Sequence, residues 1–258
     1  MTGPVVAGAG LIVVLAALTV LWFVSLRLRD ASIIDAFWGP GFTLVAFTYH
    51  LADGRLGPRV ALVLLLVLAW SARLGIHLLR RNRRQGEDPR YVAMRTEYGD
   101  RWGRVSLFRV FWLQGVILWI VSAPLFAAVR APGDLRTLDF VGVALVLIGL
   151  LLESLADAQL TRFRADPSNK GRVLDTGLWR YSRHPNYFGD AVVWWGFFGL
   201  AAGAGAWWTI FAPVIMTWLL LRVSGVPLLE QGLSATRPGY ADYVRRTSAF
   251  VPWPPKRS

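Results

Sequence analysis

Residues 177–190 have the sequence GLWRYSRHPNYFGD and lead directly into an apolar segment. Pro185 suits the first turn of a helix, where its missing N–H would have no intrahelical partner in any case. The N–H groups that follow it lack partners within the helix and, with Arg180 and Arg183 beside them, form a natural anion site. We therefore predict that this stretch begins a helix and binds a cofactor that carries phosphate or carboxylate. The alternative is the basic and aromatic flank of an ordinary membrane span.

The chain around this stretch is too apolar for a soluble domain, since 55% of its 258 residues are hydrophobic. A helix needs about 20 apolar residues to cross the hydrocarbon core of a bilayer. Seven segments approach that length, namely 4–26, 33–51, 60–79, 108–129, 138–158, 187–202 and 207–223. The sequence thus predicts an all-α polytopic membrane protein with seven transmembrane helices, built as one membrane-embedded domain over residues 1–258.

The net charge of +12 is distributed as in a membrane protein rather than as in a nucleic-acid-binding protein. With the N-terminus outside, the inner segments carry 22 Lys and Arg residues and the outer segments carry four. Positive charge concentrates on the cytoplasmic side of membrane proteins, so we predict an N-out, C-in topology, membrane lipids as partners and no nucleic acid. Because Arg outnumbers Lys by 26 to 2, we expect a bacterial chain in the inner (plasma) membrane.

Composition also excludes several kinds of chemistry. The chain has no cysteine, hence no disulfide and no thiolate ligand, and its three histidines form no metal-binding motif, so we predict no metal site. The Gly8-Ala9-Gly10 and Gly203-Ala204-Gly205 runs lie in or between apolar segments, without a preceding strand or a third glycine. Neither therefore supports a Rossmann domain.

Ionisable side chains inside the apolar segments are candidates for a site, because charge in a membrane is costly. Asp35 lies near the cytoplasmic start of the second segment, and His77 lies one turn after Arg73 in the third. Asp157 follows Glu153 at the same spacing, which places each pair on one helix face. The alternative for each residue is a structural ion pair, such as Arg73 with Asp35.

The inner segments add aromatic residues to their arginines. Residues 89–104 form a short amphipathic helix by their pattern, with Tyr91, Met94, Tyr98 and Trp102 along one side. Two such segments and the C-terminal tail on one face would close over the inner ends of the last helices.

Residues 180–190, followed by Trp194-Trp195-Gly196, resemble the membrane reductases that include steroid 5-alpha-reductases and C14 sterol reductases. The likeness is greatest to a bacterial and plant branch and extends to residues 35–39, 87–91, 156–159 and 243–252. The same superfamily contains isoprenylcysteine carboxyl methyltransferase, which shares the Arg-His-Pro-x-Tyr-x-Gly element. The chain departs from the steroid reductases in lacking a Gln-Glu pair near Asp35, which argues against a 3-keto-steroid substrate.

The resemblance implies NADPH as cofactor, held at the cytoplasmic ends of the helices in residues 138–258. Asp157 and Arg164 would contact its adenosine end, and Asn186 and Asp190 its nicotinamide end. The other residues implied in cofactor binding are Lys170, Arg180, Tyr181, Arg183, His184, Tyr187, Tyr240 and Tyr243. The catalytic candidates are Asp35, His77 and Tyr91, with His77 or Tyr91 donating a hydrogen bond to the substrate carbonyl.

The expected activity is therefore the NADPH-dependent reduction of a C=C bond in a lipid-like or steroid-like enone. The alternative enzyme is an S-adenosylmethionine-dependent methyltransferase of a lipid or prenyl group, since Glu230 and the Gly239-Tyr240-x-x-Tyr243 tail also resemble that ending. The abundance of arginine favours NADPH, which carries several phosphate charges. A lipid-binding or scaffold protein without catalysis is the third possibility.

Overall fold

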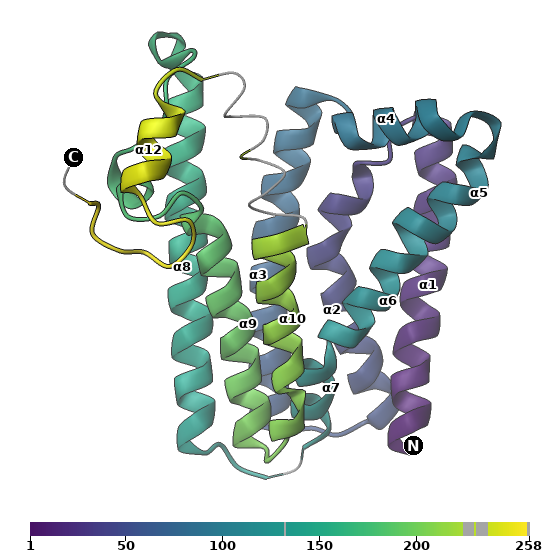
Figure 1. The fold of residues 1–258 in the computed structure, drawn as a ribbon. Coiled ribbons are helices and arrows are strands. Elements are labelled where there is room, and N and C mark those ends of the chain that lie inside the picture. The colour runs from purple at the N-terminus through teal and green to yellow at the C-terminus, as the bar shows by residue number, and fades with distance from the viewer. Residues whose placement is uncertain (132, 224–229, 231–236, 257–258) are drawn as a thin grey trace. The chain divides into compact units, whose positions relative to one another are not determined.

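The computed structural model describes residues 1–131, 133–223, 230 and 237–256, and all regular structure within these ranges is helical (Figure 1). This confirms the all-α prediction. The chain forms two compact units. Unit 1 contains Met1–Asp139 and Leu200–Thr209, and unit 2 contains Phe140–Gly199 and Ile210–Ser258.

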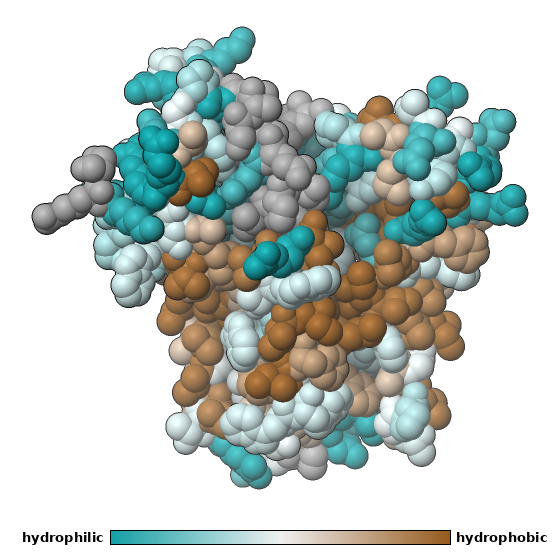
Figure 2. Space-filling model, viewed as in Figure 1, coloured by the Kyte–Doolittle hydropathy of each residue, from teal (hydrophilic) through white to brown (hydrophobic). Residues whose placement is uncertain are grey.

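Four helical stretches are long and apolar enough to cross a membrane, namely Gly3–Leu28, Pro58–Asn82, Pro89–Val121 and Thr137–Ala165. On the face seen in Figure 2, apolar side chains cover the middle of the helices and hydrophilic side chains their ends. These properties support an integral membrane protein. The other three predicted spans also fold as helices, in α2 (Ile33–Asp53), in α9 (Pro185–Gly203) and over Trp207–Val223, and their crossing of the bilayer stays a prediction.

Unit 1 begins with three long helices, α1 (Gly3–Leu28), α2 and α3 (Pro58–Gln85), which contact one another in chain order. Side-chain hydrogen bonds join later helices to them. The Tyr49 hydroxyl on α2 lies 2.8 Å from the Ser122 hydroxyl, at the junction of α6 (Leu113–Val121) and α7 (Ala123–Arg130). The Trp119 indole N–H donates to the Ala7 carbonyl of α1 at 2.8 Å.

The predicted amphipathic helix is present as α4 (Pro89–Tyr98), η1 (Gly99–Arg101) and α5 (Trp102–Ser106). Of the four residues predicted along one side, Tyr91 and Trp102 are buried and Met94 and Tyr98 are half-buried. The helix differs from the prediction in passing straight into the next span through a π-helical turn, η2 (Leu107–Trp112). The one irregular backbone angle within it is at Gly99, whose φ of +47° is in the left-handed region that favours glycine.

A buried ion pair fixes the start of α3 in unit 1. The Arg59 guanidinium donates to both carboxylate oxygens of Asp139, at 2.7 and 2.8 Å, and neither side chain is exposed to solvent. The Arg136 amide donates to the same carboxylate at 2.7 Å. The sequence predicts Arg59 only as a charge of an outer segment, whereas the structure gives its side chain a structural role.

Unit 2 is built on α8 (Thr137–Ala165) and α9, with α10 (Phe211–Trp218), the π-helical turn η6 (Leu219–Val223) and the short α12 (Tyr240–Arg246). The α8 and α9 backbones approach closely at glycines. A Cβ atom at Gly149 would lie 2.6 Å from the Gly189 carbonyl oxygen, and one at Gly189 would lie 2.8 Å from the Glu153 nitrogen. Small residues at helix interfaces permit such packing in membranes, and here they bring the polar residues of the two helices together.

Candidate functional site

The helix start predicted at Pro185 is confirmed, because α9 begins at that residue. Ser182 fixes the turn before it from both sides. Its hydroxyl accepts a hydrogen bond from the His184 amide at 3.1 Å and donates one to the Phe250 carbonyl at 2.8 Å. Since Ser182 is fully buried, the turn and the C-terminal segment pack as one structure.

Arg183 anchors the same C-terminal segment. Its side chain donates to the carbonyls of Val244 at 2.9 Å and Thr247 at 3.2 Å, and its amide donates to the Ser248 carbonyl at 2.9 Å. The guanidinium also forms an ion pair with Glu230 at 2.8 Å. Arg183, predicted as a cofactor ligand, therefore organises the site through its contacts with the chain.

His184 lies at the centre of this arrangement. Its Nε2 atom is 3.1 Å from the Glu230 carboxylate, and its ring stacks on Tyr187 with centroids 5.6 Å apart and planes 5° apart. Only 2% of His184 is exposed, and its Nδ1 atom has no hydrogen-bond partner among the described residues. A buried polar atom without a partner is unfavourable, so Nδ1 is an obvious contact point for a ligand.

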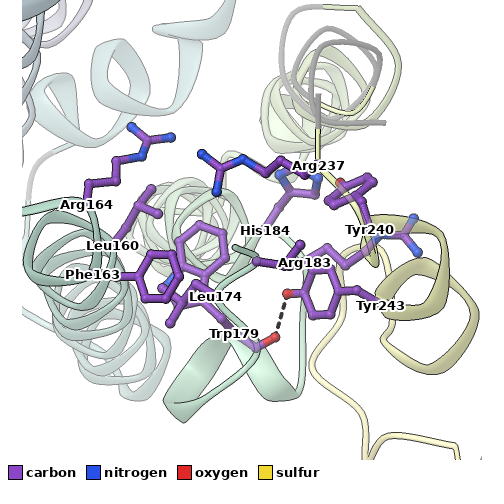
Figure 3. Close-up of a pocket in the computed structure, with 11 residues that line it drawn as sticks. Leu160, Phe163, Arg164, Leu174, Trp179, Arg183, His184, Arg237, Tyr240 and Tyr243 are labelled. Atoms are coloured by element: carbon purple, nitrogen blue, oxygen red, sulfur yellow. Dashed lines mark hydrogen bonds between the residues drawn. The ribbon is translucent and has the colours of Figure 1, made fainter. Parts of the chain in front are cut away.

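A cavity of about 90 Å³ opens beside this turn, between α8, the segment 173–184 and α12. It combines aromatic walls with guanidinium groups, and Figure 3 shows Arg164 and Arg237 reaching toward each other from α8 and from the chain before α12. Arg237 also donates to the Arg172 carbonyl. Eleven residues line the cavity: Leu160, Phe163, Arg164, Val173, Leu174, Trp179, Arg183, His184, Arg237, Tyr240 and Tyr243.

The ionisable groups around the cavity have defined charge states. Burial raises the pKa of Tyr240 to about 12 and also raises the pKa of Tyr243, so both phenols are neutral at pH 7. Tyr243 donates its hydroxyl proton to the Trp179 carbonyl at 2.5 Å. Burial acts to raise the pKa of Glu230, but its hydrogen bond with His184 and the charge of Arg183 outweigh burial and leave the pKa below its usual value. Glu230 is therefore a carboxylate at neutral pH.

A second polar group in unit 2 lies where α8 faces the first turn of α9. The Asn186 amide donates to the Asp157 carboxylate at 3.1 Å, and Asp157 is buried. The Gly-mediated contact of the two helices accounts for this pairing, which joins two predicted cofactor residues. Nearby, the Gln159 side chain accepts a hydrogen bond from the Leu178 amide at 3.0 Å and so ties α8 to the start of the motif.

Unit 1 contains a chain of hydrogen bonds around Tyr91. The Tyr91 hydroxyl donates to Asp35 at 3.0 Å and accepts from the Gln114 amide at 3.5 Å. The Trp38 indole donates to the other end of Gln114 at 2.6 Å, which orients that amide. Arg90 lies 3.6 Å from Asp35 and forms its ion pair.

The segment before α4 holds Tyr91 in this position. The Asp88 amide donates to the Ser32 hydroxyl at 2.7 Å, and the Ala31 amide donates to the Glu87 carboxylate at 2.7 Å. Glu87 also forms an ion pair with Arg95 at 2.6 Å. The start of α4 is thus fastened to the start of α2, where Asp35 lies.

The comparisons with known proteins place this arrangement in a family. The family described as "Protein of unknown function (DUF1295)" matches residues 21–247. The chain belongs to the DUF1295 family. It is 30% identical to the "Uncharacterized protein C594.04c" of Schizosaccharomyces pombe over 97% of this chain and 80% of that protein. No solved structure matches the chain.

The DUF1295 match includes both polar clusters and the cavity. Of the residues predicted to bind the cofactor, the cavity contains Arg164, Arg183, His184, Tyr240 and Tyr243. Asp157 and Asn186 form the α8–α9 pair, and Tyr187 stacks on His184. Asp190 lies one turn further along α9. The cavity lining does not include Lys170, Arg180 or Tyr181, and all three side chains are exposed.

The structure places the three catalytic candidates of this DUF1295 chain differently. The structure brings Asp35 and Tyr91 together, although they are far apart in sequence. It gives Asp35 an ion pair with Arg90 at 3.6 Å, which fits the alternative of a structural ion pair. His77 lies on α3 of the same unit and is half-buried. No group of three or more possible metal ligands occurs in the described ranges.

The sequence did not predict several residues of the cavity and of the hydrogen bonds around Tyr91. Arg237 and Phe163 line the cavity, and Gln114 orients Tyr91. Phe163 adjoins Arg164, and Arg237 lies just before Tyr240 in the Pro-Gly-Tyr turn. Each therefore lies close in the sequence to a residue that was predicted to bind the cofactor. Gln114 stands alone in an apolar segment, and its polarity was the available signal.

Proposed function

We propose that this protein is an NADPH-dependent membrane reductase that reduces a C=C bond in a lipid-like or steroid-like enone. The observation that carries the proposal is the cavity of unit 2, where Arg164 and Arg237 face each other above aromatic walls and the buried Nδ1 atom of His184 has no hydrogen-bond partner among the described residues (Figure 3).

The residues present fit a phosphorylated nucleotide. Guanidinium groups bind phosphate with strong, charge-assisted hydrogen bonds. Phe163 and Trp179 offer flat apolar surfaces for a base, and the neutral phenols of Tyr240 and Tyr243 are polar groups that do not repel an anion. When bound, NADPH would supply a hydride to the β-carbon of the activated alkene.

The chain would supply the proton and polarise the carbonyl through unit 1. In this proposal Tyr91 holds the proton at its hydroxyl oxygen, because that oxygen is oriented by both Asp35 and Gln114. Asp35 is a positioning group, because its carboxylate accepts the hydrogen bond of the Tyr91 hydroxyl. His77 is the second candidate for the donor, and an apolar surrounding strengthens either hydrogen bond. The lipid character of the substrate follows from the apolar helices that carry these groups.

A methyltransferase that uses S-adenosylmethionine is the second candidate function. The observation that favours it is the Glu230 carboxylate, which contacts Arg183 and His184, two residues of the cavity lining. A carboxylate suits a cofactor that is cationic at sulfur and carries no phosphate. Arg164 and Arg237 at the same cavity support NADPH instead.

Cofactor binding to the detergent-solubilised full-length protein tests the proposal. NADPH is expected to raise the melting temperature, NADH to raise it less, and Arg164→Ala or Arg237→Gln to reduce the NADPH effect. Arg162→Ala is the matched control, because Arg162 is an exposed α8 arginine outside the cavity lining. An NADPH effect that is equal in Arg164→Ala and the parent would remove Arg164 from the site. Stabilisation by S-adenosylmethionine alone would replace the proposal with the second candidate.

A further inference from the structure

A second cavity, of about 350 Å³, lies on the surface of unit 1 and plays no part in the proposed reaction. It is formed along one stripe of η1, α5 and η2 by three arginines and two apolar residues: Arg101, Arg104, Val105, Phe108 and Arg109. Residues three and four apart share a helix face, which explains how five residues of one segment meet there. Arg109 belongs to the π-helical turn, and such turns occur often at functional sites.

The cavity is strongly positive. None of its three arginines has a carboxylate within 4.0 Å in the described part of the chain. Arg109 donates to the Tyr98 hydroxyl at 2.8 Å, and its guanidinium carbon lies 5.7 Å from the centre of that ring. Glu97 and Asp100 are the nearest acidic residues in the sequence, and both are exposed. Three neighbouring cations repel one another, so an anion bound among them would be stabilised.

The apolar side of the cavity points to a lipid rather than to a soluble anion. Phe108 is 53% exposed and packs edge-on against Trp112, with ring centroids 5.1 Å apart. The helical segment is basic before Phe108 and apolar after it. Figure 2 shows mostly hydrophilic side chains over α4 and α5 and apolar ones over the segment that follows. Trp22 donates its indole N–H to the Gly103 carbonyl at 3.0 Å. Tryptophan and arginine at such a transition are typical of the bilayer interface.

We propose that this cavity binds the headgroup phosphate of an anionic phospholipid. Arg101 and Arg104 bind the phosphate, Arg109 closes its side with Tyr98, and Phe108 and Val105 contact the upper part of an acyl chain. Basic pockets at the ends of membrane helices bind such headgroups, and Arg suits phosphate better than Lys because its donors form a planar fork.

The test is lipid binding by the intact protein, measured by native mass spectrometry and by melting temperature. The probes are phosphatidylglycerol, phosphatidylcholine and inorganic phosphate. The parent is expected to retain phosphatidylglycerol and be stabilised by it, with little effect of the other two probes. Arg101→Gln/Arg104→Gln should lower retention at least tenfold. The matched control is Arg172→Gln/Arg245→Gln, which removes two exposed arginines of unit 2 and should retain the lipid as the parent does.

A second pair of variants separates a lipid from a free anion. Phe108→Ala should weaken phosphatidylglycerol binding, whereas Phe140→Ala, at a phenylalanine that is 61% exposed on α8, should not. Equal retention of phosphatidylglycerol by the Arg101/Arg104 variant and its control would overturn the proposal. Stabilisation by inorganic phosphate as large as that by the lipid would show a soluble-anion site and would overturn it as well.

Discussion

Arg183 holds the carboxylate of Glu230 through two hydrogen bonds, of 2.8 and 3.3 Å, and His184 contacts the same carboxylate at 3.1 Å. This network joins the turn before α9 to a residue that is more than forty positions away in the chain. Because the network contains a carboxylate, it should also make the stability of the fold depend on pH.

The pKa of Glu230 is lower in the folded protein than its usual value of 4.5 because the His184 hydrogen bond and the Arg183 charge outweigh burial. A carboxylate with a lowered pKa stabilises the fold above its unfolded pKa, and the stabilisation is lost as the pH falls through the folded pKa. The melting temperature should therefore fall below about pH 4.5 and depend less on pH in Glu230→Gln. Glu97→Gln, at an exposed carboxylate, should behave as the parent does. Identical pH profiles for Glu230→Gln and the parent would contradict this role.

The close contact of α8 and α9 predicts a large effect of one added methyl group. A Cβ atom at Gly189 would lie 2.8 Å from the Glu153 nitrogen and 2.9 Å from the Gly149 carbonyl oxygen. Overpacking of this kind costs about 1–3 kcal/mol, so Gly189→Ala should lower the melting temperature. Gly8→Ala is the control, because no atom lies within 4 Å of its Cβ position. The prediction fails if both variants unfold at the same temperature.

The buried pair of Arg59 and Asp139 predicts a contrast between two arginines. Arg59→Met would leave Asp139 with its charge buried, which typically costs about 3–5 kcal/mol. Arg55 pairs with Asp53 at 2.9 Å, and its own side chain is 47% exposed. Arg130 pairs with the same buried carboxylate at 2.9 Å, so the loss of Arg55 leaves Asp53 with a partner and should cost about 1 kcal/mol or less. Denaturation in detergent should therefore show that Arg59→Met is much less stable than Arg55→Met. A reversed or equal order would show that the Arg59 pair does not stabilise unit 1.

The distribution of basic residues predicts the orientation of the chain. A reporter fused after Ser258 should be active only in a cytoplasmic assay, and one inserted after Gly133 only in an external assay. An external C-terminus would contradict the proposed function, because the cofactor cavity would not then meet cytosolic NADPH. It would also move the proposed lipid site to the outer leaflet.

Apolar length and helix-start signals predicted most of the fold, since a run such as 138–158 has few alternatives in a bilayer. The turn before Pro185 was predicted for the same reason, because proline is favoured in the first helical turn. The contacts that build the cavity were harder to predict from the sequence. Cofactor binding by Arg183 stays a prediction, whereas its hydrogen bonds to the carbonyls of Val244, Thr247 and Ser248 were not predicted, because a backbone partner leaves no mark in the sequence. The Asp35–Tyr91 contact likewise depends on how α4 is fastened to α2.

The last prediction separates the two candidate proton donors of the proposed reductase. Tyr91 donates to Asp35 at 3.0 Å and is oriented by Gln114, whereas His77 is a half-buried residue of α3 in the same unit. Loss of the donor should slow turnover at least tenfold, equivalent to about 1.4 kcal/mol of transition-state stabilisation, and leave NADPH binding unchanged. We expect that result for Tyr91→Phe, measured as enone-dependent loss of NADPH absorbance with lipid-like enones.

The control is Tyr98→Phe, which removes the hydroxyl of another α4 tyrosine, bonded to Arg109 instead of Asp35. Gln114→Met should give a smaller loss than Tyr91→Phe, because Gln114 only orients the hydroxyl. Asp35→Asn should shift the pH profile of turnover, because it removes the carboxylate that accepts the hydrogen bond of Tyr91. If His77→Phe is slow and Tyr91→Phe is not, the donor is His77 and the Tyr91 chain is structural. If both variants turn over as the parent does while their melting temperatures fall, unit 1 contributes stability alone and the assignment of the donor to this unit is wrong.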